Sequence, residues 1–481
     1  MTADVARLAS NAAALLQAGR FPEAVTAYRE LLEHSPGRPD AWYNLGYALR
    51  VLRRFEEALA AYAQAIERGV SRAEEVHVNR AAILSEQLFR TDEAERELRA
   101  ALDVAPGFLI AWHNLGQLRE DRDDRTGARQ AYEAVLALAP NDGRAHARLA
   151  ALDVFEGKAV EAIARLEQPL KAARNADDEA ELAFAMASAR DAVGDYDEAF
   201  QGFCRANALA SARAGSRYDP AAQDRLIDEI IAAFPAPRNV ERPEPSEPKP
   251  LFICGMFRSG STLCEQLLAR HSAITAGGEL EAIPAMAGGT LSPYPATIRS
   301  MSDAQLAALG NAYLAELEAL FPGAGIVTDK RPDNFLHIGL IKALFPDAQI
   351  VHTVRNAVDN VLSVFFLYFA DSVTYGARIE DITHYYASYR RLMAHWRKLY
   401  PDIIDVDYDA LVRAPEAELK VLLGQLGLAW EDRCDPRRAM AADVRTASAW
   451  QVRQPIHQRS TGRWRNYAAH IVELRDTLSR L

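Results

Sequence analysis

The sequence predicts two folded parts of different class, an N-terminal helical solenoid and a C-terminal α/β domain built on a parallel sheet. The solenoid is predicted by a motif that recurs about every 34 residues through residues 1–210. The α/β domain is predicted by short apolar runs, each followed by a loop and a helical pattern, from Leu251 onward. We expect a solenoid with a capping helix over 1–234, a proline-rich linker over 235–250 and the α/β domain over 251–481.

Small and large apolar residues mark the repeat at regular positions. Alanines recur at separations of 34, 36, 34, 34 and 37 residues. A large apolar residue follows each alanine four positions later, in the pairs Ala24 and Tyr28, Ala58 and Tyr62, Ala94 and Leu98, Ala128 and Tyr132, Ala162 and Leu166, and Ala199 and Phe203. This spacing is typical of tetratricopeptide repeats. Because small alanines let helices approach and the larger side chains fill the gap to the next helix, we interpret both sets as core.

The concave face of such a solenoid typically binds a peptide, and the sequence leaves three uses of it as alternatives. These are recognition of an acceptor substrate, recognition of a protein partner and self-association. After the repeats, residues 218–234 show one more helical pattern, expected as the cap. The linker that follows contains six prolines and alternating charges, which predicts a stiff, extended connector.

Composition limits the classes of function. The chain has 481 residues, a formal net charge of −11 and four scattered cysteines. Residues 1–240 carry 38 acidic against 29 basic side chains, which argues against nucleic acid as a partner. The cysteine spacing predicts neither a disulfide framework nor a zinc site. The sequence shows no signal peptide pattern and no apolar run long enough for a membrane span, so we expect a cytoplasmic protein.

Five candidate strands define the α/β domain, over residues 251–255, 274–276, 325–328, 349–354 and 403–407. Helical patterns follow most of them, which predicts a parallel sheet covered on both faces. Ligands of such sheets bind at the carboxyl ends of the strands. The residues just past each strand are therefore the candidates for function.

The first strand, Leu251 to Cys254, leads through a Gly/Ser/Thr turn into a helical pattern that begins at Leu263. A helix N-terminus entered in this way presents unpaired N–H groups to an anion, and Arg258 adds a guanidinium suited to phosphate. The separation of Gly255 and Gly260 matches the nucleoside-triphosphate P-loop. The P-loop lysine is absent, because Ser261 stands in its place. The pattern predicts a phosphate cradle for a different nucleotide.

The turn resembles the 5′-phosphosulfate loop of sulfotransferases, in particular of tyrosylprotein sulfotransferases and of bacterial enzymes that join tetratricopeptide repeats to a sulfotransferase domain. The residues that carry the resemblance, and that we expect to bind nucleotide, are Arg258, Ser259, Gly260, Ser261, Thr262 and Leu263; Phe257 replaces the usual proline. The resemblance implies a P-loop-like sulfotransferase domain. It further implies 3′-phosphoadenosine 5′-phosphosulfate (PAPS) as the sulfuryl donor, 3′-phosphoadenosine 5′-phosphate (PAP) as the product, and no metal.

Two further motifs supply the catalytic candidates beside Arg258. In GGELEAIP (277–284) the resemblance places Glu279 on the family's catalytic base, with Glu281 as the competing carboxylate. A carboxylate is what an attacking hydroxyl needs to lose its proton. In TDKRPDN (328–334) Lys330 falls on the family's lysine, which would stabilise charge on the leaving phosphate, and Arg331 is the alternative.

Later motifs resemble the nucleotide-binding residues of the same family. In VHTVRNAVDNVLS (351–363) Arg355 and Ser363 match the pair that holds the 3′-phosphate, and Asn356 is a candidate N-cap. Tyr408, just past the last strand, matches a tyrosine that helps to hold the nucleotide. The stretch SAWQVRQPIHQRSTGRW (448–464) resembles the loop that covers the nucleotide, with Ser448 and Arg463 as contacts.

The sequence therefore predicts a PAPS-dependent sulfotransferase that acts on an acceptor hydroxyl. A protein tyrosine, a saccharide and a small molecule stay open as acceptors. Two alternatives remain. One is a P-loop kinase-like enzyme, which would require the missing lysine and carboxylates for Mg²⁺. The other is a tetratricopeptide scaffold whose C-terminal domain has lost catalysis.

Overall fold

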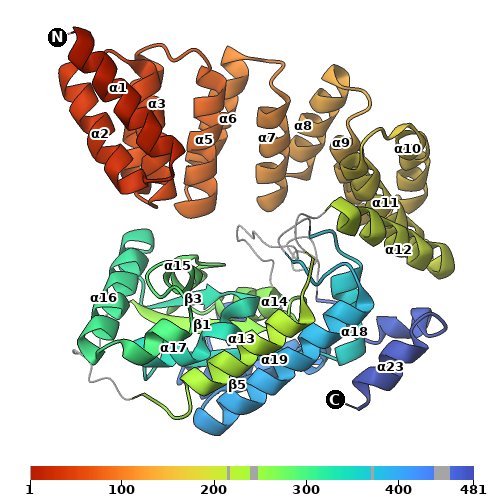
Figure 1. The fold of residues 1–481 in the computed structure, drawn as a ribbon. Helices are drawn as coiled ribbons and strands as arrows, with labels where there is room; N and C mark the ends of the chain where they lie inside the picture. The colour runs from red at the N-terminus through yellow and green to blue at the C-terminus, as the bar shows by residue number, and fades with distance from the viewer. Residues whose placement is uncertain (1, 214–216, 239–247, 370–372, 438–455, 481) are drawn as a thin grey trace. The chain divides into compact units, whose positions relative to one another are not determined.

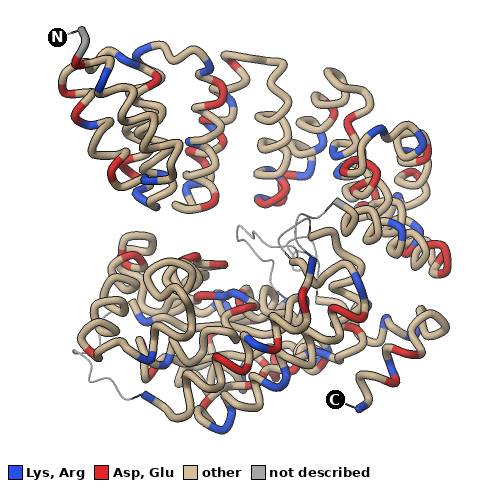
Figure 2. The backbone as a smooth tube through the Cα atoms, in the orientation of Figure 1, with Lys and Arg blue, Asp and Glu red and all other residues tan. Residues whose placement is uncertain are grey.

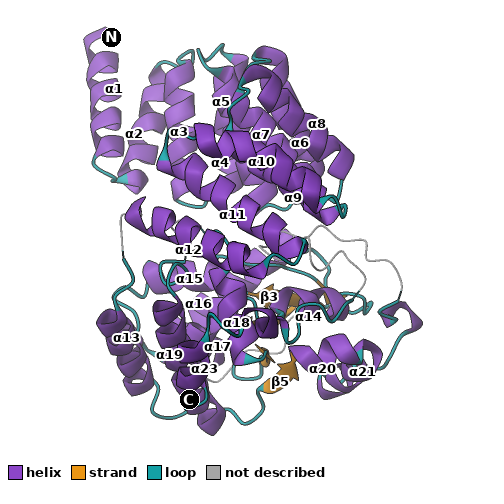
Figure 3. Cartoon of the chain, turned by 90° about the vertical axis from the view of Figure 1, so that its right-hand side faces the viewer, coloured by secondary structure: helices purple, strands orange, loops and turns teal. Residues whose placement is uncertain are grey.

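The computed structural model describes residues 2–213, 217–238, 248–369, 373–437 and 456–480. The chain forms two compact units, Met1–Ala145 and His146–Leu481 (Figure 1). The first unit is entirely helical in its described residues, and the strands gather within the second unit (Figure 3). Within the described residues, no helix combines the length and the apolar character needed to cross a membrane.

Antiparallel helix pairs build the first unit. Neighbours pack as α1 with α2, α3 with α4, α5 with α6 and α7 with α8. Their bounds are α1 Thr2–Gln17, α2 Phe21–His34, α3 Pro39–Val51, α4 Phe55–Glu67, α5 Ala73–Ala82, α6 Thr91–Val104, α7 Leu109–Asp121 and α8 Arg125–Leu138. The interval of 36 residues between Ala58 and Ala94 contains a wider π-helical turn, η1 (Ile83–Gln87).

The repeat positions form the core, as the sequence predicts. All six repeat alanines are fully buried, and the large residue four positions after each is at most 2% exposed. Two glycines explain how closely the helices approach. A Cβ atom on Gly46 would lie 2.7 Å from the ring of Tyr62, and one on Gly116 would lie 2.6 Å from the ring of Tyr132. Glycine is therefore required at both positions, because the tyrosine of the next helix lies against the backbone.

Four more helices precede the sheet in the second unit: α10 (Ala159–Ala172), α11 (Ala176–Ala192), α12 (Tyr196–Arg213) and α13 (Pro220–Ala233); α9 (Gly143–Phe155) spans the division between the units. The expected cap forms a helix, α13, which packs along α19 (Ile379–Leu399) of the α/β domain. Arg391 of α19 forms an ion pair with Asp228 of α13. Residues 239–247 of the expected linker lie outside the described residues, and the domain boundary stays a prediction.

The sheet has five parallel strands in the order β2-β3-β1-β4-β5. They are β1 Lys249–Gly255, β2 Ile274–Thr275, β3 Ile326–Lys330, β4 Gln349–Val354 and β5 Ile404–Asp407. All five lie at the predicted positions. Leu251 of β1 pairs with Thr328 of β3 on one side and with Gln349 of β4 on the other. Because the chain crosses from one side of β1 to the other between β3 and β4, the carboxyl end of β1 is a topological switch point.

Alternate residues of β1 contribute to two cores, one on each face of the sheet. Leu251 and Ile253 pack with α14 (Ser261–Leu268) and α21 (Pro415–Gln425). Phe252 faces the other way and contacts the rings of Tyr313 and Phe345. Helices on that side include α16 (Asp303–Leu320) and α17 (Ile338–Leu344). The remaining short elements are α15 Ala282–Gly288, η2 Ala296–Ser300, η3 Pro332–His337, α18 Ala357–Phe365, α20 Tyr408–Arg413, η4 Asp432–Cys434, η5 Arg463–Tyr467 and α23 Val472–Leu478.

Candidate functional site

The turn between β1 and α14 is held tightly against its neighbours. The Ser259 N–H donates to the carbonyl of Met256 at 3.0 Å, which closes a four-residue turn. Arg258, inside this turn, adopts a left-handed backbone with φ of +69°. This conformation costs an L-residue about 1–2 kcal/mol. Strain of this kind persists only where the surrounding structure requires it, and it occurs often at ligand-binding sites.

Two glycines make this turn possible. A Cβ atom on Gly255 would lie 2.5 Å from the carbonyl oxygen of Thr353 in β4. Gly260 precedes α14 with φ of +100°, and a Cβ atom there would lie 2.3 Å from the ring of Tyr408. The tyrosine predicted to hold the nucleotide therefore contacts the turn directly. The hydroxyls of Ser259 and Thr353 bond to each other at 2.7 Å, and Ser261 and Thr262 are buried at the start of α14.

Two arginines that are predicted to bind nucleotide meet at this turn. Arg258 Nε donates to Ser363 Oγ of α18 at 3.2 Å. Arg355, which follows β4, donates from Nη1 to the carbonyl of Arg258 at 3.1 Å and lies over the Tyr408 ring at 4.9 Å. The structure thus brings together Arg258, Arg355, Ser363 and Tyr408, which lie up to 150 positions apart in the sequence.

The electrostatics of these arginines favour an anion. Arg355 is only 9% exposed, and its Nε has no hydrogen-bond partner among the described residues. Burial lowers the pKa of Arg355. Burial, together with repulsion from Arg355 and Arg463, lowers the pKa of Arg258 to about 10. Lowered arginine pKa values mean that the positive charge is incompletely balanced, so a bound anion would stabilise the site.

The two glutamates of the second motif have different partners. Lys330, at the end of β3, is completely buried, and its Nζ donates to Glu279 Oε1 at 2.6 Å. The Glu279 side chain is 36% exposed, so the pair has one buried and one accessible member. Glu281 instead accepts from Arg331 at 2.6 Å. Arg331 also bonds Asp333 at 3.1 Å, which keeps this guanidinium occupied by two carboxylates.

The segment after residue 455 closes over the same end of the sheet. Asp359 of α18 accepts the N–H groups of Gly462 at 2.6 Å and Trp464 at 2.8 Å. The carbonyl of Ser460 accepts a hydrogen bond from Arg355. Asn356 caps α18 as predicted, and its side chain accepts the N–H groups of Val358 and Asp359. Sequence reasoning missed Asp359, because an acidic residue in the first turn of a helix is common at the protein surface.

The predicted contacts in this segment have different outcomes. Ser448 lies outside the described residues. Arg463 forms an ion pair with Asp191 of α11 at 2.6 Å and lies over the ring of Phe366 at 5.0 Å. Burial acts to lower the pKa of Arg463, but the Asp191 carboxylate and the Tyr467 hydroxyl together outweigh burial, so the pKa is raised. Arg463 therefore lies near the arginine site but is bound to a helix that precedes the sheet, and its contact with nucleotide stays a prediction.

Comparison with known proteins agrees with this arrangement. Residues 250–432 match the model of the sulfotransferase family. Residues 11–72 and 87–143 match a tetratricopeptide-repeat model. The chain joins tetratricopeptide repeats to a sulfotransferase domain. The residues of the turn, of the Lys330 pair and of α18 all fall within the sulfotransferase match.

Relatives with matching sequence or fold add little about activity. An uncharacterized protein of Aquifex aeolicus (strain VF5) is 28% identical over 504 residues, which is 96% of this chain and 64% of that protein. The chain thus spans less than two thirds of the length of that relative. Solved structures with similar repeats include a tetratricopeptide repeat protein from Parabacteroides merdae (18% identity, TM-score 0.36, 43% of this chain and 84% of that one). Another is pilF of Pseudomonas aeruginosa (22% identity, TM-score 0.34, 43% and 91%).

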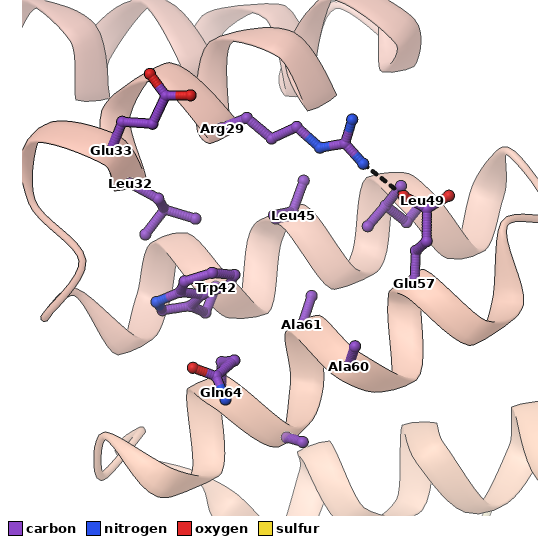
Figure 4. A pocket seen from close by; sticks show the side chains of 11 residues that line it. Arg29, Leu32, Glu33, Trp42, Leu45, Leu49, Glu57, Ala60, Ala61 and Gln64 are labelled. Carbon is purple, nitrogen blue, oxygen red and sulfur yellow. Dashed lines mark hydrogen bonds and ion pairs between the residues drawn. The ribbon is translucent and has the colours of Figure 1, made fainter.

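A cavity of about 790 Å³ lies between α2, α3 and α4 of the repeats (Figure 4). Leu32, Leu45 and Trp42 provide apolar walls, and an ion pair between Arg29 and Glu57 lies at its edge. Acidic and basic residues are intermixed along the helices of this unit (Figure 2). The described part of the chain holds no cluster of three or more His, Cys, Asp or Glu side chains arranged for a metal ion.

The sulfotransferase domain also contains a buried acid that sequence reasoning missed. Asp329 precedes Lys330 in β3 and is completely buried. It accepts hydrogen bonds from Tyr313 at 2.9 Å and from Asn334 at 3.1 Å. Burial raises the pKa of Asp329 to about 7, although both hydrogen bonds act in the opposite direction.

This pKa predicts how stability depends on pH. The native protein keeps the Asp329 proton up to about pH 7, whereas the unfolded chain releases it near 3.8. The stability that this retained proton contributes is therefore fully present below the pKa of the unfolded chain, and it is lost as the pH rises through 7. Asp329→Asn should remove this dependence. The unfolding free energy of the variant minus that of wild type should therefore increase by about 2–3 kcal/mol when the pH is raised from about 5 to about 8.

Urea unfolding of the full chain at the two pH values measures the change. Tyr313→Phe is the matched comparison, because loss of this donor should raise the Asp329 pKa further and extend the same fall to higher pH. Parallel pH dependences for wild type and Asp329→Asn would contradict the assignment.

Proposed function

We propose that the protein is a PAPS-dependent sulfotransferase that moves a sulfuryl group to an acceptor hydroxyl. The observation that carries this proposal is the meeting of Arg258, Arg355 and Ser363 at the glycine turn after β1. Two guanidinium groups with lowered pKa values, a buried one on Arg355 and a partly buried one on Arg258, lie beside the N-terminus of α14, which favours an anion with more than one phosphate.

The same contacts support separate sites for the two ends of the nucleotide. The turn and the first N–H groups of α14 are suited to the 5′-phosphosulfate, because a helix N-terminus carries partial positive charge. Arg355 and Ser363 are suited to the 3′-phosphate, since the unpaired Nε of Arg355 and the partly exposed hydroxyl of Ser363 are available as donors. Arg258, bonded to Ser363, lies between the two positions and would stabilise charge on both.

PAPS supplies an activated sulfuryl group joined through oxygen to its 5′-phosphate. In the transfer, a new bond forms between the acceptor oxygen and sulfur, and the bond from sulfur to the phosphate oxygen breaks. Glu279 takes the proton of the acceptor hydroxyl. Lys330 and Arg258 stabilise the negative charge that develops on the leaving phosphate of PAP. The products are the sulfated acceptor and PAP, and the proton remains on Glu279 until solvent removes it.

The ion pair between Glu279 and Lys330 fits these roles. A partly exposed carboxylate can reach an acceptor from solvent, whereas a completely buried ammonium stays directed into the site. Binding of donor and acceptor would replace the pair by two contacts, one from Lys330 to the donor and one from Glu279 to the hydroxyl. Glu281 is less suited to be the base, because its carboxylate is held by Arg331.

The other assignments have less support. A kinase-like P-loop requires a lysine that this chain lacks, since buried Ser261 occupies the position. Activity with PAPS in the presence of EDTA, and none with ATP, would separate the two enzymes. Absence of PAP binding would leave only a scaffold. We propose that the repeats recognise the acceptor or a protein partner, and the cavity lined by Trp42 is the first region to test.

The base assignment predicts the effect of Glu279→Gln. Loss of the carboxylate should lower transfer from labelled PAPS by about 100-fold or more, because general-base catalysis typically contributes 10²–10⁴-fold. PAP affinity, measured by calorimetry, should change little. Glu281→Gln is the matched control and should keep most of the activity. Normal turnover by Glu279→Gln would remove the assignment.

The 3′-phosphate assignment predicts a selective loss of affinity. Arg355→Gln should weaken PAP binding by about 10-fold to 100-fold, since a hydrogen bond to a charged group contributes about 1.5–3 kcal/mol. Binding of adenosine 5′-phosphate, which lacks the 3′-phosphate, should weaken much less. Arg459, an exposed arginine in the segment that begins at residue 456, provides the control Arg459→Gln. Equal losses for both nucleotides would contradict the assignment of Arg355.

A further inference from the structure

A buried carboxylate on α14 has no role in the chemistry described above. Glu265 lies on the helix that follows the glycine turn and is 2% exposed. Its Oε1 accepts two hydrogen bonds, from Thr328 Oγ1 at 2.6 Å and from the backbone N–H of Gly278 at 3.0 Å. These partners belong to β3 and to the loop after β2. One side chain therefore joins three segments of the sulfotransferase domain.

Both partners lie next to the proposed reacting groups. Thr328 is two positions before Lys330, and Gly278 is one position before Glu279. The loop and the strand are also joined directly, because Gly277 N–H donates to Thr328 Oγ1 at 3.0 Å and Lys330 N–H donates to the carbonyl of Gly278 at 2.8 Å. Glu265 thus completes a network that ends in the Lys330 to Glu279 ion pair.

The backbone leaves little room for another arrangement of this loop. A Cβ atom on Gly277 would lie 2.1 Å from the carbonyl oxygen of Thr328, so the loop lies directly against β3. Gly278 has φ of +69°, a left-handed conformation that favours glycine. The orientation of the Glu279 backbone therefore depends on how Gly278 is held, and Glu265 accepts its N–H.

Burial of this acid is costly. Burial raises the pKa of Glu265, an effect that attraction to Lys330 and the two hydrogen bonds partly offset and that repulsion from Glu279 increases. An apolar residue of similar volume would be buried at this position without this cost. A residue whose burial is unfavourable and whose partners both adjoin the reacting pair fits a role in function better than one in stability.

We propose that Glu265 is a positioning residue for sulfuryl transfer, which holds the Glu279 loop against β3 and so sets the separation of the base from Lys330. The inference rests on the proposed function. When Glu279 leaves Lys330 to meet an acceptor hydroxyl, its backbone must stay in place, and the bonds from Glu265 to Gly278 and Thr328 supply that restraint. A displacement of about 1 Å in such a site can cost about 100-fold in rate.

Two substitutions separate the hydrogen bonds from the charge. Glu265→Gln keeps a carbonyl oxygen that can accept from both partners, whereas Glu265→Leu keeps the approximate volume and removes both bonds. Labelled PAPS is used with the best acceptor from a panel of a tyrosine peptide, a phenol and a saccharide. We expect Glu265→Leu to lower kcat by about 100-fold with PAP affinity within about threefold, and Glu265→Gln to retain most of kcat.

Thr328→Val removes a hydrogen bond of the same network and tests it independently if Glu265→Leu fails to fold. It should lower kcat with PAP affinity kept, and its effect should not add to that of Glu265→Leu where both can be measured. Hydrogen exchange of the peptide that contains Gly278 should accelerate in Glu265→Leu and Thr328→Val, and not in Glu265→Gln.

The outcomes distinguish this inference from the proposed function. If wild type forms no sulfated product from PAPS with any acceptor of the panel and does not bind PAP, the proposed function fails. If wild type is active, the positioning role is overturned when Glu265→Leu or Thr328→Val has wild-type kcat. It is also overturned when Glu265→Gln loses as much kcat as Glu265→Leu, because the hydrogen bonds would then be irrelevant.

Discussion

The arrangement of this site depends on two guanidinium groups at a strained turn, one on partly buried Arg258 and one on buried Arg355. Arg258 has a left-handed backbone, and its carbonyl is held by Arg355. Gly255 and Gly260 are required because Thr353 and Tyr408 lie where side-chain carbon atoms would be. Both arginines have lowered pKa values. The molecule therefore keeps positive charge in a partly desolvated place, and we propose that an anion with several phosphates balances this charge.

Elements outside the sheet help to hold the backbone around Arg355 in place. Asp359 binds the backbone of the segment that ends at Trp464, and Ser460 in that segment accepts from Arg355. The same segment is anchored on α11, where Asp191 contacts both Arg463 and Tyr467. The helices before the sheet in the second unit are thus part of the support of the proposed nucleotide site. Their packing links the end of the repeat region to the region where we propose that the 3′-phosphate binds.

Much of the fold could be predicted from the sequence, because its signals are local. The strands are short apolar runs that end at turn residues, and the repeat alanines recur at a constant spacing. Arg258 and Arg355 were predictable as neighbours because each follows a strand at the same edge of the sheet, whereas Ser363 lies about two turns into α18 and was predicted there only through the family resemblance. The packing of α13 along α19 was not, since the helical pattern of α13 identifies an apolar face but not the element that covers it.

The buried acids show where sequence reasoning ends. Glu265, Asp329 and Asp359 look like ordinary surface charges, because acidic residues are seldom buried. Their burial depends on partners distant in the chain, such as Thr328 for Glu265 and Gly462 for Asp359. Arg463 gives the converse case. Its position in the motif was informative, but the direction of its side chain depends on Asp191, which lies 272 positions earlier.

The most direct measurement of the central claim is a crystal structure of the full chain with PAP bound. The account predicts the 5′-phosphate at the N-terminus of α14, within hydrogen-bond distance of the turn between Gly255 and Thr262. It predicts the 3′-phosphate in contact with Arg355 and Ser363. PAP bound elsewhere, or bound with its 3′-phosphate in solvent and Arg355 directed away from it, would contradict the account.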